Sequence, residues 1–100
     1  MKLFIDTSNS ERIFIKLNDQ NYMAAGSQKK AQALLPFINE KLKDNGKTIH
    51  DLTEIEVFTG PGSFTGLRVG VSVAQALGWS LNIPVNGKKA GEEEIEIKYS

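Results

Sequence analysis

The sequence predicts an α/β fold in which helices cover a mixed sheet, because strand-like and helix-like segments follow one another along its 100 residues. Three short apolar segments come first and are separated by the polar turns DTSNS and NDQN, as in an antiparallel meander. Two longer segments with helical periodicity follow, and each precedes another short apolar run. The expected order is therefore β-β-β-α-β-α-β, in one small domain with a modest core.

The first three strands are expected at KLFID, RIFIKL and YMAA. The first stops at Asp6, where the apolar run meets a cluster of turn residues. In the second, Ile13, Ile15 and Leu17 alternate with other residues, which is the period of a half-buried strand. Tight polar turns join the three segments, so neighbouring strands should run antiparallel.

A first helix is expected from about Gln28 to Asp44, with Gly46 as its stop signal. Pro36 lies inside this segment, and an interior proline costs about 3 kcal/mol. We therefore expect either a kink at Pro36 or a helix that begins near it. The apolar stripe expected to face the core comprises Ala31, Leu34, Leu35, Ile38 and Leu42.

A buried strand, IEVF, precedes a second helix from about Thr65 to Leu81, and IPV is a further short strand. Small residues recur along this helix every four positions, which leaves a groove without side chains. An interior glycine costs roughly 1 kcal/mol relative to alanine, so close approach of a neighbouring element is expected there. The groove is formed by Gly66, Gly70, Ala74 and Gly78, and Val73, Leu77 and Leu81 flank it on the expected core face.

The glycine-rich loop TGPGSFTGLRVG joins the buried strand to the second helix. Its spacing differs from a P-loop, since Leu67 stands where the lysine belongs, and from a dinucleotide loop, which is one residue shorter. The Gly60-Pro61-Gly62 turn is therefore expected to redirect the chain for packing. An anion site at the free amides of the helix start, with Arg68 beside it, is the alternative.

The polar side of the second helix carries a possible protein-binding face. Arg68, Ser72, Gln75 and Trp79 are spaced to lie along one side. Tryptophan and arginine are frequent anchors of protein interfaces, and Trp79 is the only tryptophan of the chain. Phe37 lies off the core stripe of the first helix. Together with Phe37, these four residues predict a partner face built from both helices. In the alternative, Trp79 packs over the helix edge or under the C-terminal tail.

Composition limits the possible functions. Twelve basic and twelve acidic residues balance, so the chain lacks the basic surface with which proteins bind nucleic acid alone. The absence of cysteine excludes disulfides and thiolate metal sites. No apolar run approaches the roughly 20 residues of a membrane helix, and the opening MKLFIDTSNS is too short in its apolar part for a signal peptide. These features indicate a cytoplasmic protein without membrane contact.

The C-terminal segment, residues 88–100, departs from the α/β order. NGKKAG is a polar linker, and EEEIEIKYS then alternates between charged and apolar residues. This pattern predicts a terminal edge strand whose charges discourage further pairing. The alternative is an acidic tail without a fixed structure.

The stretch GPGSFTGLRVGVSVAQALG resembles the signature of the TsaB/YeaZ family of tRNA threonylcarbamoyladenosine biosynthesis proteins. LFIDTS, the first helix with its connector, and LGWSLNIPVNG are similar to the family's other segments, so the resemblance covers about residues 2–87. It implies an actin-like, ribonuclease-H-like fold. Family members have two such lobes, and this sequence is expected to contain the first, residues 1–87.

The resemblance also implies a function without catalysis. TsaB-like proteins bind the related subunit TsaD, which transfers a threonylcarbamoyl group to an adenosine beside the anticodon of tRNAs that read ANN codons. Their N-terminal lobe contributes the helices of that contact, and the ATPase TsaE joins the assembly. TsaB-like proteins also form homodimers through a similar surface. This chain is thus expected to be a scaffold subunit, without a cofactor, that meets tRNA only indirectly.

Candidate catalytic groups are few. Asp6, Thr7 and Ser8 resemble the first phosphate loop of actin-like proteins, and with Ser63 and Arg68 they are the candidates for a nucleotide site. The alternative is a local turn in which Asp6 or Ser8 caps backbone amides. His50, the only histidine, is expected to be a solvent-exposed loop residue, so no metal site and no serine peptidase are expected. A nucleotide-binding domain and a homodimer without TsaD remain the alternative functions.

Overall fold

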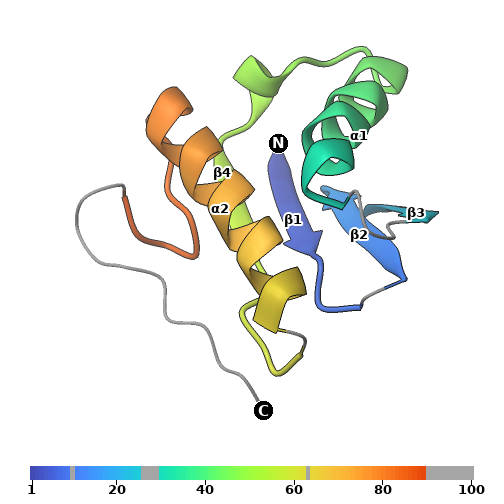
Figure 1. The fold of residues 1–100 in the computed structure, drawn as a ribbon. Helices are drawn as coiled ribbons and strands as arrows, with labels where there is room; N and C mark the ends of the chain where they lie inside the picture. Colours follow the sequence, from blue (N-terminus) through green and yellow to red (C-terminus); the bar gives the residue numbers. More distant parts are fainter. Residues whose placement is uncertain (10, 26–29, 63, 90–100) are drawn as a thin grey trace.

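The computed structural model describes residues 1–9, 11–25, 30–62 and 64–89. From the first strand to the second helix, the elements follow one another in the expected order, β-β-β-α-β-α (Figure 1). The elements are β1 (Lys2–Asp6), β2 (Arg12–Leu17), β3 (Gln20–Ala25), α1 (Lys30–Asp44), a 3-10 turn η1 (Ile49–Asp51), β4 (Glu54–Val57) and α2 (Phe64–Leu81). No helix within these described ranges is long and apolar enough to cross a membrane.

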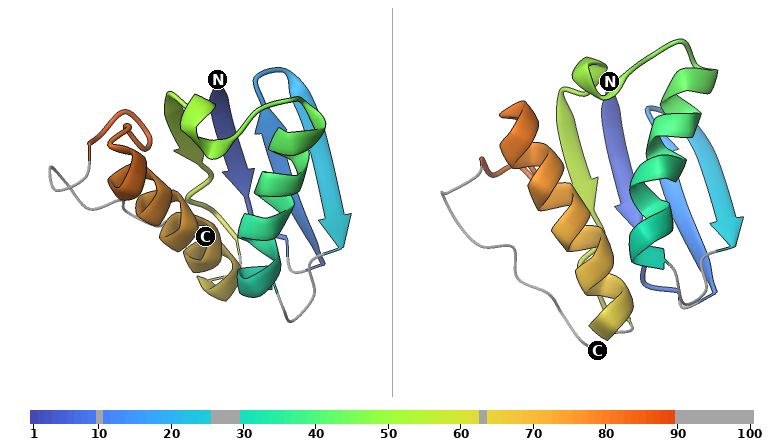
Figure 2. Two further views of the ribbon diagram at one scale, coloured as in Figure 1. Left: turned by 90° about the horizontal axis from the view of Figure 1, so that it is seen from above. Right: turned by 45° about the horizontal axis from the view of Figure 1, so that its top comes forward.

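The four strands form one mixed sheet in the order β3-β2-β1-β4. The meander is antiparallel, with Leu17 opposite Gln20 across the two-residue turn Asn18-Asp19, and β4 lies parallel to β1. Asn18 takes a positive φ of 53° in that turn, a conformation that asparagine tolerates well. Both helices lie on the same side of the sheet (Figure 2), so the other side has no helix in the described part of the chain. The expected mixed α/β fold is confirmed.

The core lies between the sheet and the two helices. Alternate strand residues point into it, because successive side chains of a strand face opposite sides. On α1 the buried residues follow helical spacing. The most deeply buried side chains include Leu3, Ile5, Ile13, Ile15, Leu34, Ile38, Leu42 and Leu67.

Helix α1 corrects two expectations. The helix continues through Pro36, so it does not begin there; it starts at Lys30, and the expected start at Gln28 lies outside the described residues. Leu35 is 39% exposed and is not a core residue, because the core stripe of Leu34, Ile38 and Leu42 already faces the sheet and Leu35 lies to one side of it.

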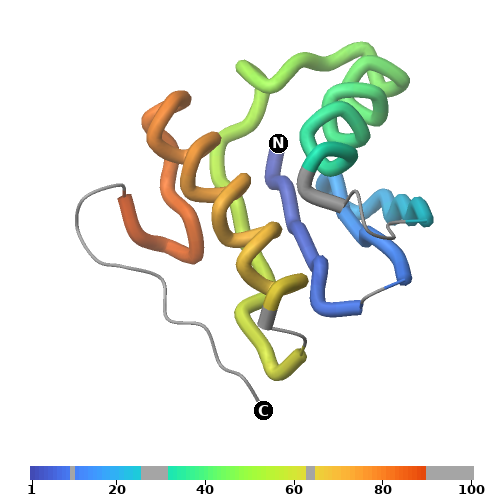
Figure 3. The backbone as a smooth tube through the Cα atoms, in the orientation of Figure 1, coloured from blue at the N-terminus to red at the C-terminus, as the bar shows by residue number. Residues whose placement is uncertain are grey.

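The IPV segment does not form a strand. Val85 makes single bridges to Ile55 and to Lys88, because Pro84 has no amide donor and a turn begins at Asn86. Asn86 and Gly87 both have positive φ, as in the two-residue turns of hairpins, and Val85 and Lys88 exchange two backbone hydrogen bonds across them. The tube in Figure 3 follows this reversal beyond the end of α2.

The same segment closes the free edge of β4. The Ile55 amide donates to Pro84 O at 2.9 Å, and the Asn86 amide donates to Ile55 O at 2.8 Å. At Val57 a side chain replaces the backbone: Asn86 Oδ1 accepts from the Val57 amide at 2.8 Å, and Asn86 Nδ2 donates to Val57 O at 3.1 Å. These bonds occupy the outward backbone groups of β4, so another strand cannot pair there. The predicted edge strand in EEEIEIKYS lies outside the described residues.

Candidate functional site

The start of α2 is fastened to the end of β1 by one buried threonine. The Thr7 hydroxyl donates to Gly66 O and accepts from the Gly70 amide at 3.0 Å. Gly66 and Gly70 are four residues apart, so their carbonyl and amide belong to the same helical turn. Thr7 therefore holds the first turns of α2 against the sheet, and its hydroxyl is engaged in packing.

Glycines let α2 approach its neighbours, as the sequence predicts. A Cβ placed on Gly70 would lie 2.6 Å from Thr7 Oγ1, and one on Gly78 would lie 2.4 Å from Val85 Cγ2. In the loop before α2, a Cβ on Gly62 would lie 2.8 Å from Ser8 Cβ, so the glycine turn rests against the turn after β1. Gly60 has a φ of 128°, which favours glycine in this turn.

The Asp6-Thr7-Ser8 segment forms a local turn. Asp6 Oδ1 accepts from the Ser8 amide at 2.9 Å and from the Ser8 hydroxyl at 2.6 Å. This is the geometry in which an aspartate caps a backbone amide two residues on. Ser63 lies outside the described residues, and Arg68 is exposed on α2. The hydrogen bonds of Asp6 and Thr7 thus serve the structure of the loop.

The candidate partner residues of α2 lie on the surface. Arg68, Ser72, Gln75 and Trp79 are all exposed, and Trp79 is 72% exposed. Trp79 is one of three large apolar side chains found exposed within the described ranges, beside Leu35 and Met23. A large exposed indole next to polar residues is typical of a protein-binding surface.

Phe37 is not brought together with these four residues. It is half-buried against the core, and Lys41 Nζ lies 5.5 Å from its ring and 5.7 Å from the ring of Tyr22. Since Tyr22 belongs to β3, Phe37 lies on the flank of α1 toward that strand. The structure therefore separates Phe37 from the α2 face.

Sequence reasoning assigned Leu35 to the core stripe of α1 and did not identify it as an exposed apolar side chain. Its position one residue after Leu34 places it on the other flank of α1 from Phe37. On α2, Val69 and Val73 are half-buried and pack against the core cluster. The helices α1 and α2 contact each other directly. The signal in the sequence is that Leu35 follows Leu34 and cannot share its direction.

His50 is exposed, as expected, in the turn η1, where Thr48 caps the amides. Among the described residues no group of three or more histidines or carboxylates is arranged to hold a metal ion. The described residues thus combine a glycine loop that packs against the turn after β1 with an exposed face on α2.

Comparison with known proteins agrees with this arrangement. Residues 24–88 match a family model described as TsaD: tRNA N6-adenosine threonylcarbamoyltransferase. The tRNA threonylcarbamoyladenosine biosynthesis protein TsaB of Bacillus subtilis is 35% identical over 88 residues, which cover 84% of this chain and 38% of that protein. The protein of the same name from Escherichia coli is 36% identical over 56 residues, or 56% of this chain and 24% of the relative.

A solved structure has the same fold. YeaZ from Pseudomonas aeruginosa matches with a TM-score of 0.70 and 30% sequence identity. The match covers 84% of this chain and 41% of that chain. The match therefore spans about two fifths of the length of the Bacillus subtilis protein and of the solved YeaZ chain.

Proposed function

Because the chain belongs to the TsaD family and is a TsaB/YeaZ-like lobe of it, we propose that it is a non-catalytic scaffold subunit for threonylcarbamoyl transfer to tRNA. It binds a TsaD homologue, which modifies the adenosine next to the anticodon of tRNAs reading ANN codons, and TsaE joins the assembly. Its place of action is the cytoplasm. The observation that carries this proposal is the 72% exposed Trp79 on the outer side of α2.

The role of the scaffold is geometric. The helical layer docks on TsaD and shifts it toward its productive conformation, because a partner that binds one state better increases that state's population. The net charge of this chain is zero, so contacts with the tRNA phosphates fall mainly to TsaD.

The local bonds of the first loop favour this role over nucleotide binding. Asp6 Oδ1 holds the Ser8 amide and hydroxyl, and Thr7 holds the first turns of α2. A nucleotide site would have to replace these bonds. Addition of Mg-ATP is therefore expected to leave the melting temperature unchanged, since only a ligand that binds the folded state raises it.

Light scattering after size exclusion tests the proposal. The chain is run alone and mixed with the TsaD homologue of its own source, and a stable mixed peak is expected. Trp79→Ala should weaken that complex at least tenfold, because truncation of an interface anchor costs about 2 kcal/mol or more.

Met23→Ala is the matched control. Met23 is also a large exposed apolar residue, 60% exposed, but it lies on β3. This variant should bind TsaD as the original chain does. A chain that stays a monomer or a homodimer beside TsaD would contradict the scaffold function and favour the homodimer alternative.

A further inference from the structure

The β3 edge of the sheet is open within the described part of the chain. β3 is the outer strand of the order β3-β2-β1-β4, and it pairs with β2 without a bulge, from Arg12 opposite Ala25 to Leu17 opposite Gln20. No described residue pairs with its other side. Such an edge is a template on which a further strand can form.

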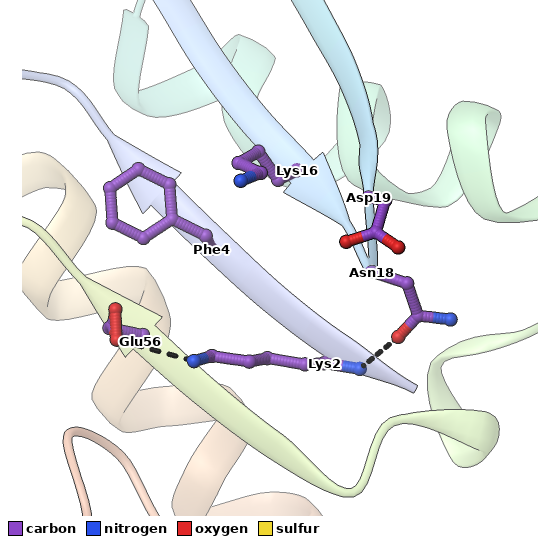
Figure 4. Close-up of a pocket in the computed structure, with 6 residues that line it drawn as sticks. All are labelled: Lys2, Phe4, Lys16, Asn18, Asp19 and Glu56. Carbon is purple, nitrogen blue, oxygen red and sulfur yellow. Dashed lines mark hydrogen bonds and ion pairs between the residues drawn. The ribbon is translucent and has the colours of Figure 1, made fainter.

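The residues that direct backbone groups outward follow from the hydrogen bonds of the sheet. The Asn18 amide donates to Lys2 O at 2.9 Å, and the Lys2 amide donates to Asn18 Oδ1 at 3.0 Å (Figure 4), so position 18 points toward β1. The direction alternates along a strand, so the odd-numbered residues of β2 bond β3, and their partners are the even-numbered residues of β3. Asn21, Met23 and Ala25 therefore direct their amides and carbonyls away from the sheet.

The β3 strand lacks the features by which edge strands usually avoid pairing. Its sequence, QNYMAA, has no charged residue and no proline. The strand β4 differs, because Pro84 O, the Asn86 amide and the Asn86 side chain occupy its outward groups. Among the described residues, the fold thus closes one edge of the sheet and leaves the other able to accept a strand.

We propose that β3 pairs with β3 of a second copy of this chain, antiparallel and about a two-fold axis through Met23. In this register Met23 lies opposite Met23 and Asn21 lies opposite Ala25, so the outward groups of β3 pair and about six backbone hydrogen bonds form. The interface is self-complementary, as a two-fold axis requires. The two sheets join into one, with the helices of both copies on the same side.

Apolar side chains on the helix-free face match in this register. Met23 is 60% exposed, and Phe14, which lies opposite it on β2, is half-buried. Pairing brings the two Met23 Cα atoms to about 5.5 Å, with a Phe14 on the outer side of each. Phe4 extends the row, since its ring packs edge to face on Phe14 at a centroid distance of 6.1 Å. The contact removes apolar surface from water, which favours association.

The charges near the axis are also compatible with a second copy. Arg12 reaches over β3, with Nη1 4.0 Å from Met23 Sδ. Asp19 lies in the turn at the other end of β3 and on the same face (Figure 4). Antiparallel pairing brings the Arg12 end of one copy beside the Asp19 end of the other, so opposite charges approach twice. Lys16 stays about 14 Å from Arg12 of the second copy, because both β3 strands lie between them. The other carboxylates of this face belong to β1 and β4, further from the axis, and are Asp6, Glu54 and Glu56.

This surface differs from the α2 face that we propose for TsaD. Helix α2 contacts β1 and β4, away from the β3 edge, so pairing at β3 leaves Trp79 uncovered. A dimer formed through β3 can therefore bind TsaD on each copy. The two proposals fail or hold independently.

Analytical ultracentrifugation of the full chain tests the pairing. About six hydrogen bonds are near the lower end for a specific interface, so the mass should rise from monomer toward dimer between about 10 µM and about 1 mM protein. Met23→Lys should weaken the dimer at least tenfold, because like charges then lie directly opposite each other. The matched control Asn39→Lys adds the same charge at an exposed position of α1 and should dimerise as the original chain does.

A mixture of two variants tests the axis. Met23→Lys mixed with Met23→Glu should form a dimer at least tenfold tighter than either variant alone, since opposite charges then meet at position 23. Circular dichroism of both variants checks that the fold is retained.

Amide hydrogen exchange, followed by NMR, tests the register. The outward amides of Asn21 and Met23 should exchange more slowly as the protein concentration rises. The Tyr22 amide, which points toward β2, should exchange slowly at every concentration.

Three results would overturn the proposal. The first is a chain that stays monomeric at about 1 mM. The second is a dimer that Met23→Lys leaves intact and Trp79→Ala dissociates, which would assign the contact to the α2 face. The third is slow exchange of the Met23 amide already in the monomer, which would mean that another segment of the same chain occupies the β3 edge.

Discussion

The Gly70 amide donates a 3.0 Å hydrogen bond to the Thr7 hydroxyl, which joins the second turn of α2 to the end of β1. The residues are 63 positions apart in the sequence. Their contact depends on glycine, because a Cβ at position 70 would lie 2.6 Å from Thr7 Oγ1 and 3.3 Å from Ile5 Cγ2. This relationship explains why a residue that weakens an isolated helix stands inside α2.

Gly70→Ala is therefore expected to lower the free energy of unfolding. Alanine favours the helix by about 1 kcal/mol, but overpacking a fixed core costs about 1–3 kcal/mol, and β1 cannot move away without disturbing the sheet. Urea unfolding followed by circular dichroism measures the difference. Ser72→Ala, an exposed change in the same helix, should be stable within about 0.5 kcal/mol of the original chain. A stabilised Gly70→Ala chain would contradict the close contact.

Thr7→Val should cost about 1–3 kcal/mol of unfolding free energy, because the side chain keeps its shape but loses bonds to two buried backbone groups. Thr7→Ser keeps the hydroxyl and should recover most of this loss. Thermal melts of the two variants under the same conditions separate the hydrogen bonds from the packing. Equal melting temperatures for valine and serine would show that the hydroxyl contributes nothing.

Asn86 combines a positive φ of 51° with a side chain that bonds both backbone groups of Val57. Asn86→Gly keeps the backbone conformation and removes the amide, so it should destabilise the chain by about 1–2 kcal/mol. Asn86→Ala loses the amide and also strains the turn, so it should be less stable than the glycine variant. Urea unfolding gives both values. If the two variants matched the original chain, the side chain would not be what closes the edge of β4.

Trp79 is the only tryptophan, so its fluorescence reports on a single position. In the free chain its emission should be that of an indole in water and should be readily quenched by acrylamide, since the side chain is 72% exposed. Addition of a tryptophan-free TsaD homologue should shift the emission to shorter wavelength and reduce quenching. An emission already shifted in the free, monomeric chain would mean that another part of this chain covers the indole.

Sequence periodicity was sufficient for the order of the elements from β1 to α2, but it also predicted a strand at IPV that does not form. Alternation in RIFIKL and four-residue spacing in α1 and α2 reflect local backbone geometry, which each segment carries by itself. The glycines at 70 and 78 indicated close packing for the same reason, since their cost within a helix is local.

The candidate surface was only partly predictable. Helical spacing placed Arg68, Ser72, Gln75 and Trp79 on one side of α2, where they are exposed. It could not place Phe37 or Leu35, because both flank the core stripe of α1. Which flank is covered depends on the neighbouring strand and helix, and Tyr22 with Lys41 covers the side of Phe37.

The sequence by itself determined the four strands of the sheet, the two helices and the glycine positions, because these follow from side-chain periods and backbone preferences. Tertiary structure decided which partner each of them meets. Thr7 reaches Gly70, and the Asn86 side chain takes the place of a strand beside Val57. Such contacts join residues far apart in the chain, and their energies exist only when folding has brought both partners to the same place.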